Sequence, residues 1–279
     1  MKKFDNIIIV TDLDGTFLGK DAFLVERNLR AVEYFKQNGG SFAVATGRVP
    51  SHVKEAVPMI GELASMPCIT NNGGCIYDFG ADKVVKIYPT PFGAIRDAVN
   101  MIHRDFPEAC VRGASLEYGF ITTEQDVPNK YMVYDFTKNA TITKLVAPVD
   151  EWEKYPLFKM AVRCAPELIE PIIASLLDRF GDVLSPVQSG STTIDVLSRG
   201  LNKGVLLREL VSVPEYAGKK IYACGDHTND IEMLAEADVA VCPRGAHERT
   251  KAVSDLCLCS NDEGVVANLI EYIENNELK

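Results

Sequence analysis

Two carboxylates stand one residue apart at the end of an apolar run near the start of the chain. The stretch "IIIVTDLDGTFL" places Asp12 and Asp14 directly behind a β-branched segment. Residues two apart on an extended chain face the same side, so both carboxylates could enter one pocket. Two anions a few ångströms apart cannot both stay ionised at low cost, so either one holds a proton or a cation lies nearby.

A third carboxylate, that of Asp226, follows another apolar run in the stretch "CGDHTND". Three hard oxygen groups without His or Cys suit Mg²⁺, a metal that keeps several waters and readily shares its site with a phosphate. Aspartates at such positions can also be simple helix caps. For a single Asp the cap is the better interpretation, but three converging on one edge favour a metal site.

Other stretches carry groups suited to a phosphate. "ATGR" offers the Thr46 hydroxyl and the amides around Gly47, and "LNKG" brings the point charge of Lys203 to the start of a helix. Asn229 and Asp230 can cap the helix that follows them and also serve a site. Alone, Thr46 is more often a cap and Lys203 a solvated lysine, so the prediction depends on their convergence.

The elements that must position these groups alternate between strand and helix. Buried-strand patterns such as "NIIIVTD" and "SFAVATGR" flank an amphipathic segment, residues 50–65 look helical, and "PCITNNGG" predicts a third strand. The alternation returns from Lys203 onward. This order predicts an α/β fold with a doubly wound, Rossmann-like parallel sheet, whose ligands bind beyond the carboxyl ends of the strands.

The middle of the chain has a different pattern and indicates an insertion. A proline-rich start leads into a helix, and short strand patterns follow, among them "LFKMAVRC" and "STTIDVLS". Residues 124–154 give no clear pattern. We therefore expect a core formed by residues 1–87 and 191–279, interrupted by an α+β domain over residues 88–190.

Composition narrows the function classes. The 279 residues carry a formal net charge of −10, which disfavours sequence-independent nucleic-acid binding, and no apolar run approaches the ~20 residues of a membrane span. The eight cysteines are scattered, mostly in apolar runs, which is typical of reduced core residues. We expect a cytoplasmic protein with neither a nucleic-acid nor a membrane partner, while its oligomeric state is not readable.

The four stretches together resemble the haloacid dehalogenase superfamily, in particular the Cof-like sugar phosphatases with a type IIB cap. "DLDGT", "ATGR", "LNKG" and "GDHTND" are similar to that family's four motifs, in the same order, and "NNGG" at 71–74 is similar to its Asn-Gly turn. The resemblance covers nearly the whole chain and implies that the insertion is a cap that determines substrate specificity.

The resemblance implies a role for each residue. Asp12 would attack phosphorus to form an aspartyl-phosphate, and Asp14, which must carry a proton near neutral pH, would act as acid and then as base. Mg²⁺ would bind the side chains of Asp12 and Asp226 and the backbone carbonyl of Asp14.

The same resemblance implies which groups hold the phosphoryl oxygens. They are the amides of Leu13 and Gly47 together with the side chains of Thr46, Lys203 and Asn229. Asp230 would orient Lys203.

The implied function is a Mg²⁺-dependent phosphatase for small phosphorylated metabolites, such as sugar phosphates. Two alternatives stay open: a phosphosugar mutase of the phosphomannomutase kind on the same core, and a non-catalytic sensor of a phosphorylated ligand. The intact Asp14 argues against the sensor, which could dispense with an acid/base group.

Some positions depart from the family's pattern or stay undecided. Pro243 and Gly245 stand in "VCPRGA", where relatives often have Ala-Met-Gly-Asn-Ala, and His227 occupies a variable position, where a capping or solvent-facing role is favoured. Seven polar residues of the cap could contact a substrate, although each is more plausibly surface or packing: His103, Arg104, Arg112, Tyr118, Lys130, Tyr131 and Arg163.

Overall fold

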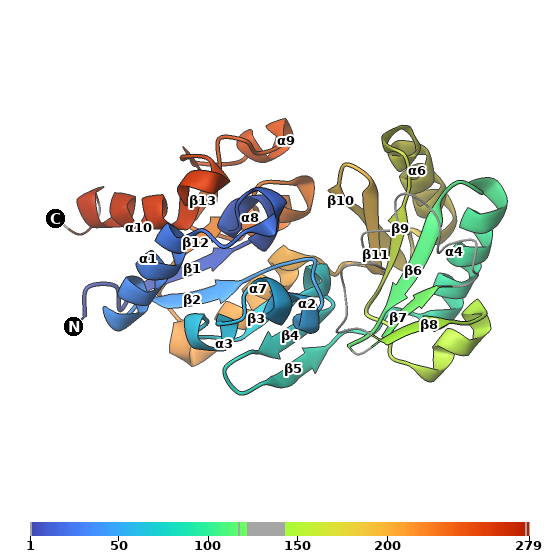
Figure 1. The fold of residues 1–279 in the computed structure, drawn as a ribbon, viewed down its shortest axis with the longest axis horizontal. Coiled ribbons are helices and arrows are strands. Elements are labelled where there is room, and N and C mark those ends of the chain that lie inside the picture. The colour runs from blue at the N-terminus through green and yellow to red at the C-terminus, as the bar shows by residue number, and fades with distance from the viewer. Residues whose placement is uncertain (1, 117, 122–142, 277, 279) are drawn as a thin grey trace. The chain divides into compact units, whose positions relative to one another are not determined.

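The computed structural model describes residues 2–116, 118–121, 143–276 and 278 (Figure 1). The chain forms two compact units. The first comprises Met1–Thr46, Val53–Lys86 and Asn202–Lys279, and the second comprises Gly47–His52 and Ile87–Leu201. The predicted insertion at 88–190 differs from this division at its second end. Residues beyond 190 stay in the second unit because the strand Thr193–Ser198 pairs with strands of that unit.

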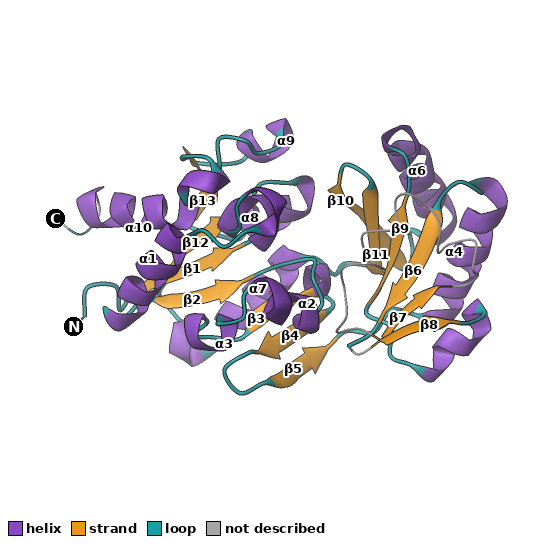
Figure 2. Cartoon of the chain, in the orientation of Figure 1, coloured by secondary structure: helices purple, strands orange, loops and turns teal. Residues whose placement is uncertain are grey.

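The first unit is built on a five-stranded parallel sheet of order β14-β13-β12-β1-β2 (Figure 2). Its strands are β1 (Ile7–Thr11), β2 (Ser41–Val44), β12 (Lys220–Cys224), β13 (Val239–Cys242) and β14 (Leu256–Cys257). All four strand pairs are parallel. The predicted parallel α/β core is confirmed. Because β1 and β12 are neighbours in register, the residues that follow them emerge at one edge.

Six α-helices of the described residues lie wholly in the first unit: α1 (Glu26–Gln37), α3 (Ile60–Leu63), α7 (Lys203–Val211), α8 (Ile231–Ala235), α9 (Glu248–Lys251) and α10 (Val265–Asn276). Helix α2 (Pro50–Ala56) is divided between the two units at Val53. Helix α1 packs against α10, and α7 packs against α8. The helical character predicted for residues 50–65 is confirmed, but it is divided into two helices: Pro58 separates α2 from α3, because proline lacks a backbone N–H and disfavours helix in the residue before it. Among the described residues, no helix has the length and apolarity to cross a lipid bilayer.

A small antiparallel sheet completes the first unit. Its strands are β3 (Cys68–Thr70), β4 (Cys75–Asp78) and β5 (Lys83–Ile87). β3, predicted as the third strand of the main sheet, is not assigned to that sheet, although it lies beside β2: a parallel bridge joins Ala45, directly after β2, to Ile69, and the N–H of Thr46 donates to the Ile69 carbonyl at 2.9 Å. The turn between β3 and β4 is the "NNGG" stretch, and β5, which is mostly exposed, was not predicted from its pattern.

The second unit has a six-stranded sheet of order β10-β11-β9-β6-β7-β8. Its strands are β6 (Cys110–Ala114), β7 (Tyr118–Ile121), β8 (Thr143–Val146), β9 (Lys159–Arg163), β10 (Leu184–Gly190) and β11 (Thr193–Ser198). Helices α4 (Phe92–Asp105) and α6 (Ile169–Phe180) share a hydrophobic core with one face of this sheet, including Met160, Val162 and Trp152. The predicted α+β character of the insertion is confirmed.

Most of the cysteines are reduced core residues, as the sequence predicted. All eight are free thiols, and six of them are buried, whereas Cys257 is exposed and Cys259 is partly exposed. Burial raises the pKa of Cys68 to about 12, which keeps this thiol protonated and unreactive at neutral pH.

Candidate active site

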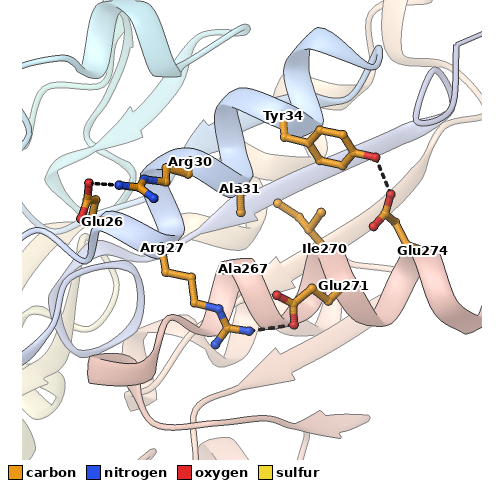
Figure 3. A pocket seen from close by; sticks show the side chains of 9 residues that line it. All are labelled: Glu26, Arg27, Arg30, Ala31, Tyr34, Ala267, Ile270, Glu271 and Glu274. Atoms are coloured by element: carbon orange, nitrogen blue, oxygen red, sulfur yellow. Dashed lines mark hydrogen bonds and ion pairs between the residues drawn. The ribbon is translucent and has the colours of Figure 1, made fainter.

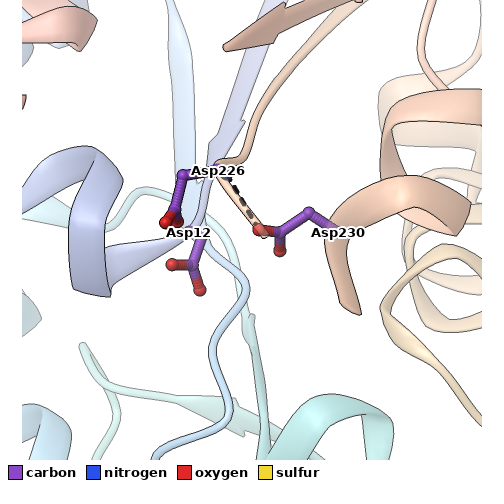
Figure 4. Close-up of side chains that lie close together, drawn as sticks. All are labelled: Asp12, Asp226 and Asp230. Carbon is purple, nitrogen blue, oxygen red and sulfur yellow. Dashed lines mark hydrogen bonds between the residues drawn. The ribbon is translucent and has the colours of Figure 1, made fainter. Parts of the chain in front are cut away.

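Strands β1 and β12 bring two predicted carboxylates together. The backbone N–H of Asp12 donates to the carbonyl of Cys224 at 2.8 Å, which extends the β1–β12 ladder by one residue, and Asp226 lies two residues after that carbonyl. The carboxylates of Asp12, Asp226 and Asp230 each offer an oxygen within 4.8 Å of the other two (Figure 4). This three-carboxylate cluster matches the ligand chemistry of a hard divalent cation.

Lys203 lies inside this cluster. Its side chain is 0% exposed, and its Nζ donates to Oδ1 of Asp12 at 2.6 Å and to Oδ1 of Asp230 at 2.6 Å. The lysine opens α7, whose N-cap Asn202 accepts a hydrogen bond from the N–H of Val205. The interpretation of Lys203 as a solvated surface lysine is therefore wrong. The stretches "DLDGT" and "LNKG", which the sequence predicts to lie at one edge of the sheet, are in contact through Asp12 and Lys203.

Asp230 is engaged through both of its carboxylate oxygens. Oδ1 accepts from Lys203, and Oδ2 accepts the backbone N–H groups of Asp226 at 3.0 Å and His227 at 3.1 Å. A side chain at Gly225 would meet the Cβ of Asp230 at 2.4 Å, so only glycine leaves room for this arrangement. Asp230 thus holds both the lysine and the turn that carries Asp226.

Asp226 is fixed from the β1 side by the turn Leu13–Phe17. The Thr16 hydroxyl donates to Oδ1 of Asp226 at 3.0 Å, and Gly15 has a positive φ of 80° in a place where a Cβ would lie 2.4 Å from Asp226 Oδ2. Asp14 lies on the same turn and is exposed, whereas Asp12 is buried. The two carboxylates that the sequence directs to one pocket therefore differ in solvent access.

Charge and burial oppose each other in the cluster. Burial raises the pKa of Asp12, and the ammonium of Lys203 opposes that shift. Burial, together with the charge of Asp230, raises the pKa of Asp226 to about 7. Burial alone would lower the pKa of Lys203, but the carboxylates of Asp12 and Asp230 raise it above its usual value, so the lysine stays charged.

A second group of predicted residues is joined through Asn72. The N–H of Asn72 donates to the Thr46 carbonyl at 2.9 Å, and the side-chain amide of Asn229 donates to Asn72 Oδ1 at 3.0 Å. Asn72 has a positive φ of 53°, which Asn tolerates better than most residues. The sequence did not assign it a role; the signal was the "NNGG" turn directly after a strand.

Two predicted backbone sites lie at the ends of their elements. The side chain of Leu13 is fully buried beneath the turn after β1. Gly47 follows Thr46 and belongs to the second unit, where its carbonyl accepts a hydrogen bond from Lys159 Nζ at 2.7 Å.

The departures from the family pattern lie in the loop after β13 and in the turn after β12. The N–H of His247 donates to the Asp226 carbonyl at 2.8 Å, and the His247 and His227 rings are 5.4 Å apart. His227 occupies the N-cap of the turn Thr228–Asp230, in agreement with the capping role favoured for it. Pro243 closes a turn by accepting from the N–H of Ala246, and a side chain at Gly245 would meet open space.

Four of the polar cap residues named from the sequence have described side chains in the second unit. Arg112 and Arg163 lie on β6 and β9 and are partly buried, and His103 and Arg104 lie in the last turn of α4. Lys130 and Tyr131, and the side chain of Tyr118, lie outside the described residues.

A groove of about 460 Å³ runs between α1 and α10 (Figure 3). Its charged groups bind one another: Arg27 pairs with Glu271 at 2.7 Å, and Tyr34 donates to Glu274 at 2.6 Å. The residues predicted for the active site do not line this groove.

Comparison with known proteins agrees with the motifs. Residues 9–270 match the family model of haloacid dehalogenase-like hydrolases. The chain is 23% identical, over 97% of each chain, to the 5-amino-6-(5-phospho-D-ribitylamino)uracil phosphatase YbjI of Escherichia coli. It superposes on the crystal structure of SMU.1108c from Streptococcus mutans with a TM-score of 0.82, at 23% identity, covering 96% of this chain and 99% of that one.

A further solved structure, the subclass IIB sugar phosphatase BT4131, matches with a TM-score of 0.76 at 19% identity, covering 98% of this chain and 99% of that one. The chain belongs to the haloacid dehalogenase-like hydrolase family. The predicted class, a phosphatase of the Cof-like group, is confirmed by the family match and by the relatives named as phosphatases. The role of each site residue stays a prediction.

Proposed function

We propose that the protein is a Mg²⁺-dependent phosphatase that hydrolyses small phosphorylated metabolites, such as sugar phosphates, through an aspartyl-phosphate. One observation carries the proposal. The buried Nζ of Lys203 lies 2.6 Å from carboxylate oxygens of both Asp12 and Asp230, beside the third carboxylate of Asp226. This arrangement gives one negative nucleophile, one fixed positive charge and spare oxygen ligands within a single cluster.

The donor set fits a magnesium ion. Asp12 and Asp226 would hold it with their carboxylates and Asp14 with its backbone carbonyl, since both oxygens of Asp230 already accept hydrogen bonds. A bound ion supplies positive charge that offsets the repulsion between the phosphoryl oxygens and the Asp12 carboxylate.

The residues of the chain divide the chemistry between two steps. In the first step an Asp12 oxygen forms a bond to phosphorus while the bond from phosphorus to the ester oxygen breaks, and Asp14 gives its proton to the departing alkoxide. In the second step water attacks phosphorus, Asp14 takes a proton from that water, and the bond to Asp12 breaks to release inorganic phosphate. The exposure of Asp14 suits its contact with both the alcohol and the water.

Binding of the phosphoryl oxygens is assigned to groups around this centre. The amides of Leu13 and Gly47 and the Thr46 hydroxyl would donate hydrogen bonds, and Lys203 would supply charge. Asn229 would donate from its side-chain amide, whose orientation is fixed by its bond to Asn72.

The names of two relatives support the proposed substrate class. YbjI is named for a substrate with a phosphorylated ribityl chain, and BT4131 is titled a sugar phosphatase. Both act on a phosphate ester of a polyhydroxylated carbon chain, and we assign this chemistry to the present protein. We also propose a cytoplasmic location and no nucleic-acid or membrane partner, in line with the net charge of −10.

A panel of sugar and polyol phosphates tests the proposal. Phosphate release is measured with Mg²⁺ and with EDTA, for the parent and for Asp12→Asn. We expect turnover of at least one ester that requires Mg²⁺ and Asp12. If no ester is hydrolysed, or if the variant matches the parent, the proposed function is wrong; conversion of a hexose 1-phosphate to its 6-phosphate without phosphate release would instead indicate the mutase.

A further inference from the structure

The second unit contains a buried lysine that the proposed chemistry does not use. Lys159 is 6% exposed at the start of β9, and its partner Asp195 on β11 is 2% exposed. The intervening core residues Met160, Val162 and Ile194 face the helices, so the Lys159–Asp195 pair lies on the opposite face of the sheet. Burying both charges is costly unless each is fully bonded, which suggests a specific role for the pair.

The ammonium of Lys159 contacts three oxygens. Nζ lies 2.9 Å and 3.0 Å from the two carboxylate oxygens of Asp195, and it donates to the carbonyl of Gly47 at 2.7 Å. Two of these contacts are hydrogen bonds, to Oδ2 of Asp195 and to the Gly47 carbonyl, and the contact with Oδ1 of Asp195 is an ion-pair contact. Asp195 therefore holds the lysine in place, and the second hydrogen bond of Lys159 is directed at a backbone group far away in the sequence.

That backbone group belongs to the segment that begins the second unit. Gly47–His52 lies in the same compact unit as Lys159, and Val49 packs against Ala114, which is the β6 partner of Lys159 in the sheet register. Two contacts, one polar and one apolar, thus fix the chain within three residues of Thr46. Glycine has the widest backbone freedom of any residue, so an external bond is needed to restrict Gly47.

We propose that Lys159 is a positioning residue for phosphate binding: by holding the Gly47 carbonyl it fixes the backbone on which the Gly47 amide must face the phosphoryl oxygens. Asp195 acts by holding Lys159. The inference rests on the proposed function, because it assigns the Gly47 amide to phosphate. Lys159 itself touches no reacting atom.

The test compares three variants that disturb the ion pair in different ways. Lys159→Met removes the donor to Gly47 and leaves the buried carboxylate of Asp195 without its cation. Asp195→Asn weakens the pair but keeps that donor. The double variant Lys159→Met, Asp195→Leu removes both charges, so that no buried charge is left unpaired. For each, the dissociation constant of inorganic phosphate with Mg²⁺ is measured by phosphorus NMR titration, and the melting temperature is measured separately.

We expect phosphate binding to weaken roughly 10-fold in Lys159→Met and in the double variant, and less than about 3-fold in Asp195→Asn, as the loss of one charge-assisted hydrogen bond predicts. Stability should fall in both single variants and recover in the double variant. The proposal is overturned if phosphate affinity follows the melting temperature through all three, or if the parent binds no phosphate. A parent that binds phosphate but hydrolyses no ester contradicts the proposed function and leaves this comparison valid.

Discussion

Two buried lysines, one in each unit, have opposite surroundings. Lys203 bonds to Asp12 and Asp230, with Asp226 beside them, so three carboxylates surround one ammonium. With all three carboxylates ionised, those four side chains would carry an excess of two negative charges, which is the charge that one divalent cation would neutralise. This excess explains why the cluster of the first unit can hold a metal ion in addition to its lysine.

The cluster around Lys159 has the reverse balance. One carboxylate, Asp195, faces Lys159, while the guanidinium groups of Arg112 and Arg163 act on the lysine from β6 and from the far end of β9. Burial lowers the pKa of Lys159, and the single carboxylate of Asp195, opposed by the two arginines, does not reverse that shift; at Lys203 burial acts in the same direction, but two carboxylates outweigh it and raise the pKa. The comparison teaches that burial alone does not distinguish the two lysines: the number of carboxylates and arginines around each ammonium does, and only the cluster of Asp12, Asp226 and Asp230 has carboxylates to spare for a metal ion.

The largest expected effect is on the rate of ester hydrolysis, which should distinguish the carboxylates around Lys203 from the carboxylate beside Lys159. Asp12→Asn removes the proposed nucleophile and should lower the rate of ester hydrolysis by roughly 10³-fold or more. Asp195→Asn disturbs an equally buried carboxylate but should lower it by less than about 10-fold, since Asp195 touches no reacting atom. Steady-state phosphate release measures both. Equal losses in the two variants would show that the clusters do not differ in function.

The next effect is on stability. Lys203→Met leaves Asp12 and Asp230 buried without their cation and should reduce the free energy of unfolding by about 3–5 kcal/mol, measured by urea denaturation in EDTA. Added Mg²⁺ should restore a larger share of this loss than in Lys159→Met, because the ion neutralises only the carboxylate cluster. An equal response of both variants to Mg²⁺ would contradict the charge argument.

The first of these clusters was predictable from the sequence, and the second was not. Asp12, Asp226 and Lys203 follow strands or open a helix in an α/β pattern, and parallel strands bring such positions to one edge. The Lys159–Gly47 bond joins residues 112 positions apart, and the Asn229–Asn72 bond joins residues 157 apart. Such contacts depend on tertiary packing, which local patterns of apolar residues do not predict.

The predicted boundaries of some elements and of the inserted unit differ from those in the structure. Residues 50–65 are helical as predicted, but the prediction did not include the break at Pro58, although proline is a readable signal. The predicted core resumes at residue 191, which would place β11 in the first unit. The pattern of β11 identifies a strand but not the sheet that it joins, and β11 pairs with β9 in the second unit. The exposed strand β5 lacks the apolar alternation by which a half-buried strand is recognised.

A third prediction concerns the metal. EDTA should abolish hydrolysis, and Mg²⁺ at about 100 times its dissociation constant should raise the free energy of unfolding of the parent by about 2.7 kcal/mol. Asp226→Asn should need roughly 10-fold more Mg²⁺ for half-maximal activity, because a proposed ligand loses its charge. Asp195→Asn is the matched control and should keep the Mg²⁺ requirement of the parent. A normal requirement in Asp226→Asn would remove this residue from the metal site.

The smallest effect is a dependence of stability on pH that arises from Lys159. Because its pKa is lowered in the folded state, the folded protein loses that proton before the unfolded chain does at about 10.5. Between these two values the unfolded state binds more protons, so the stability of the parent should rise with pH relative to the double variant Lys159→Met, Asp195→Leu, by at most about 1.4 kcal/mol per pH unit. Lys203, whose pKa is raised, gives the opposite sign, with stability lost as pH rises above 10.5. Urea denaturation of both proteins from pH 8.5 to 10.5 measures the difference. A difference that stays flat or falls with pH would mean that Asp195 outweighs burial and the two arginines, and that the two lysines are surrounded by the same sign of charge after all.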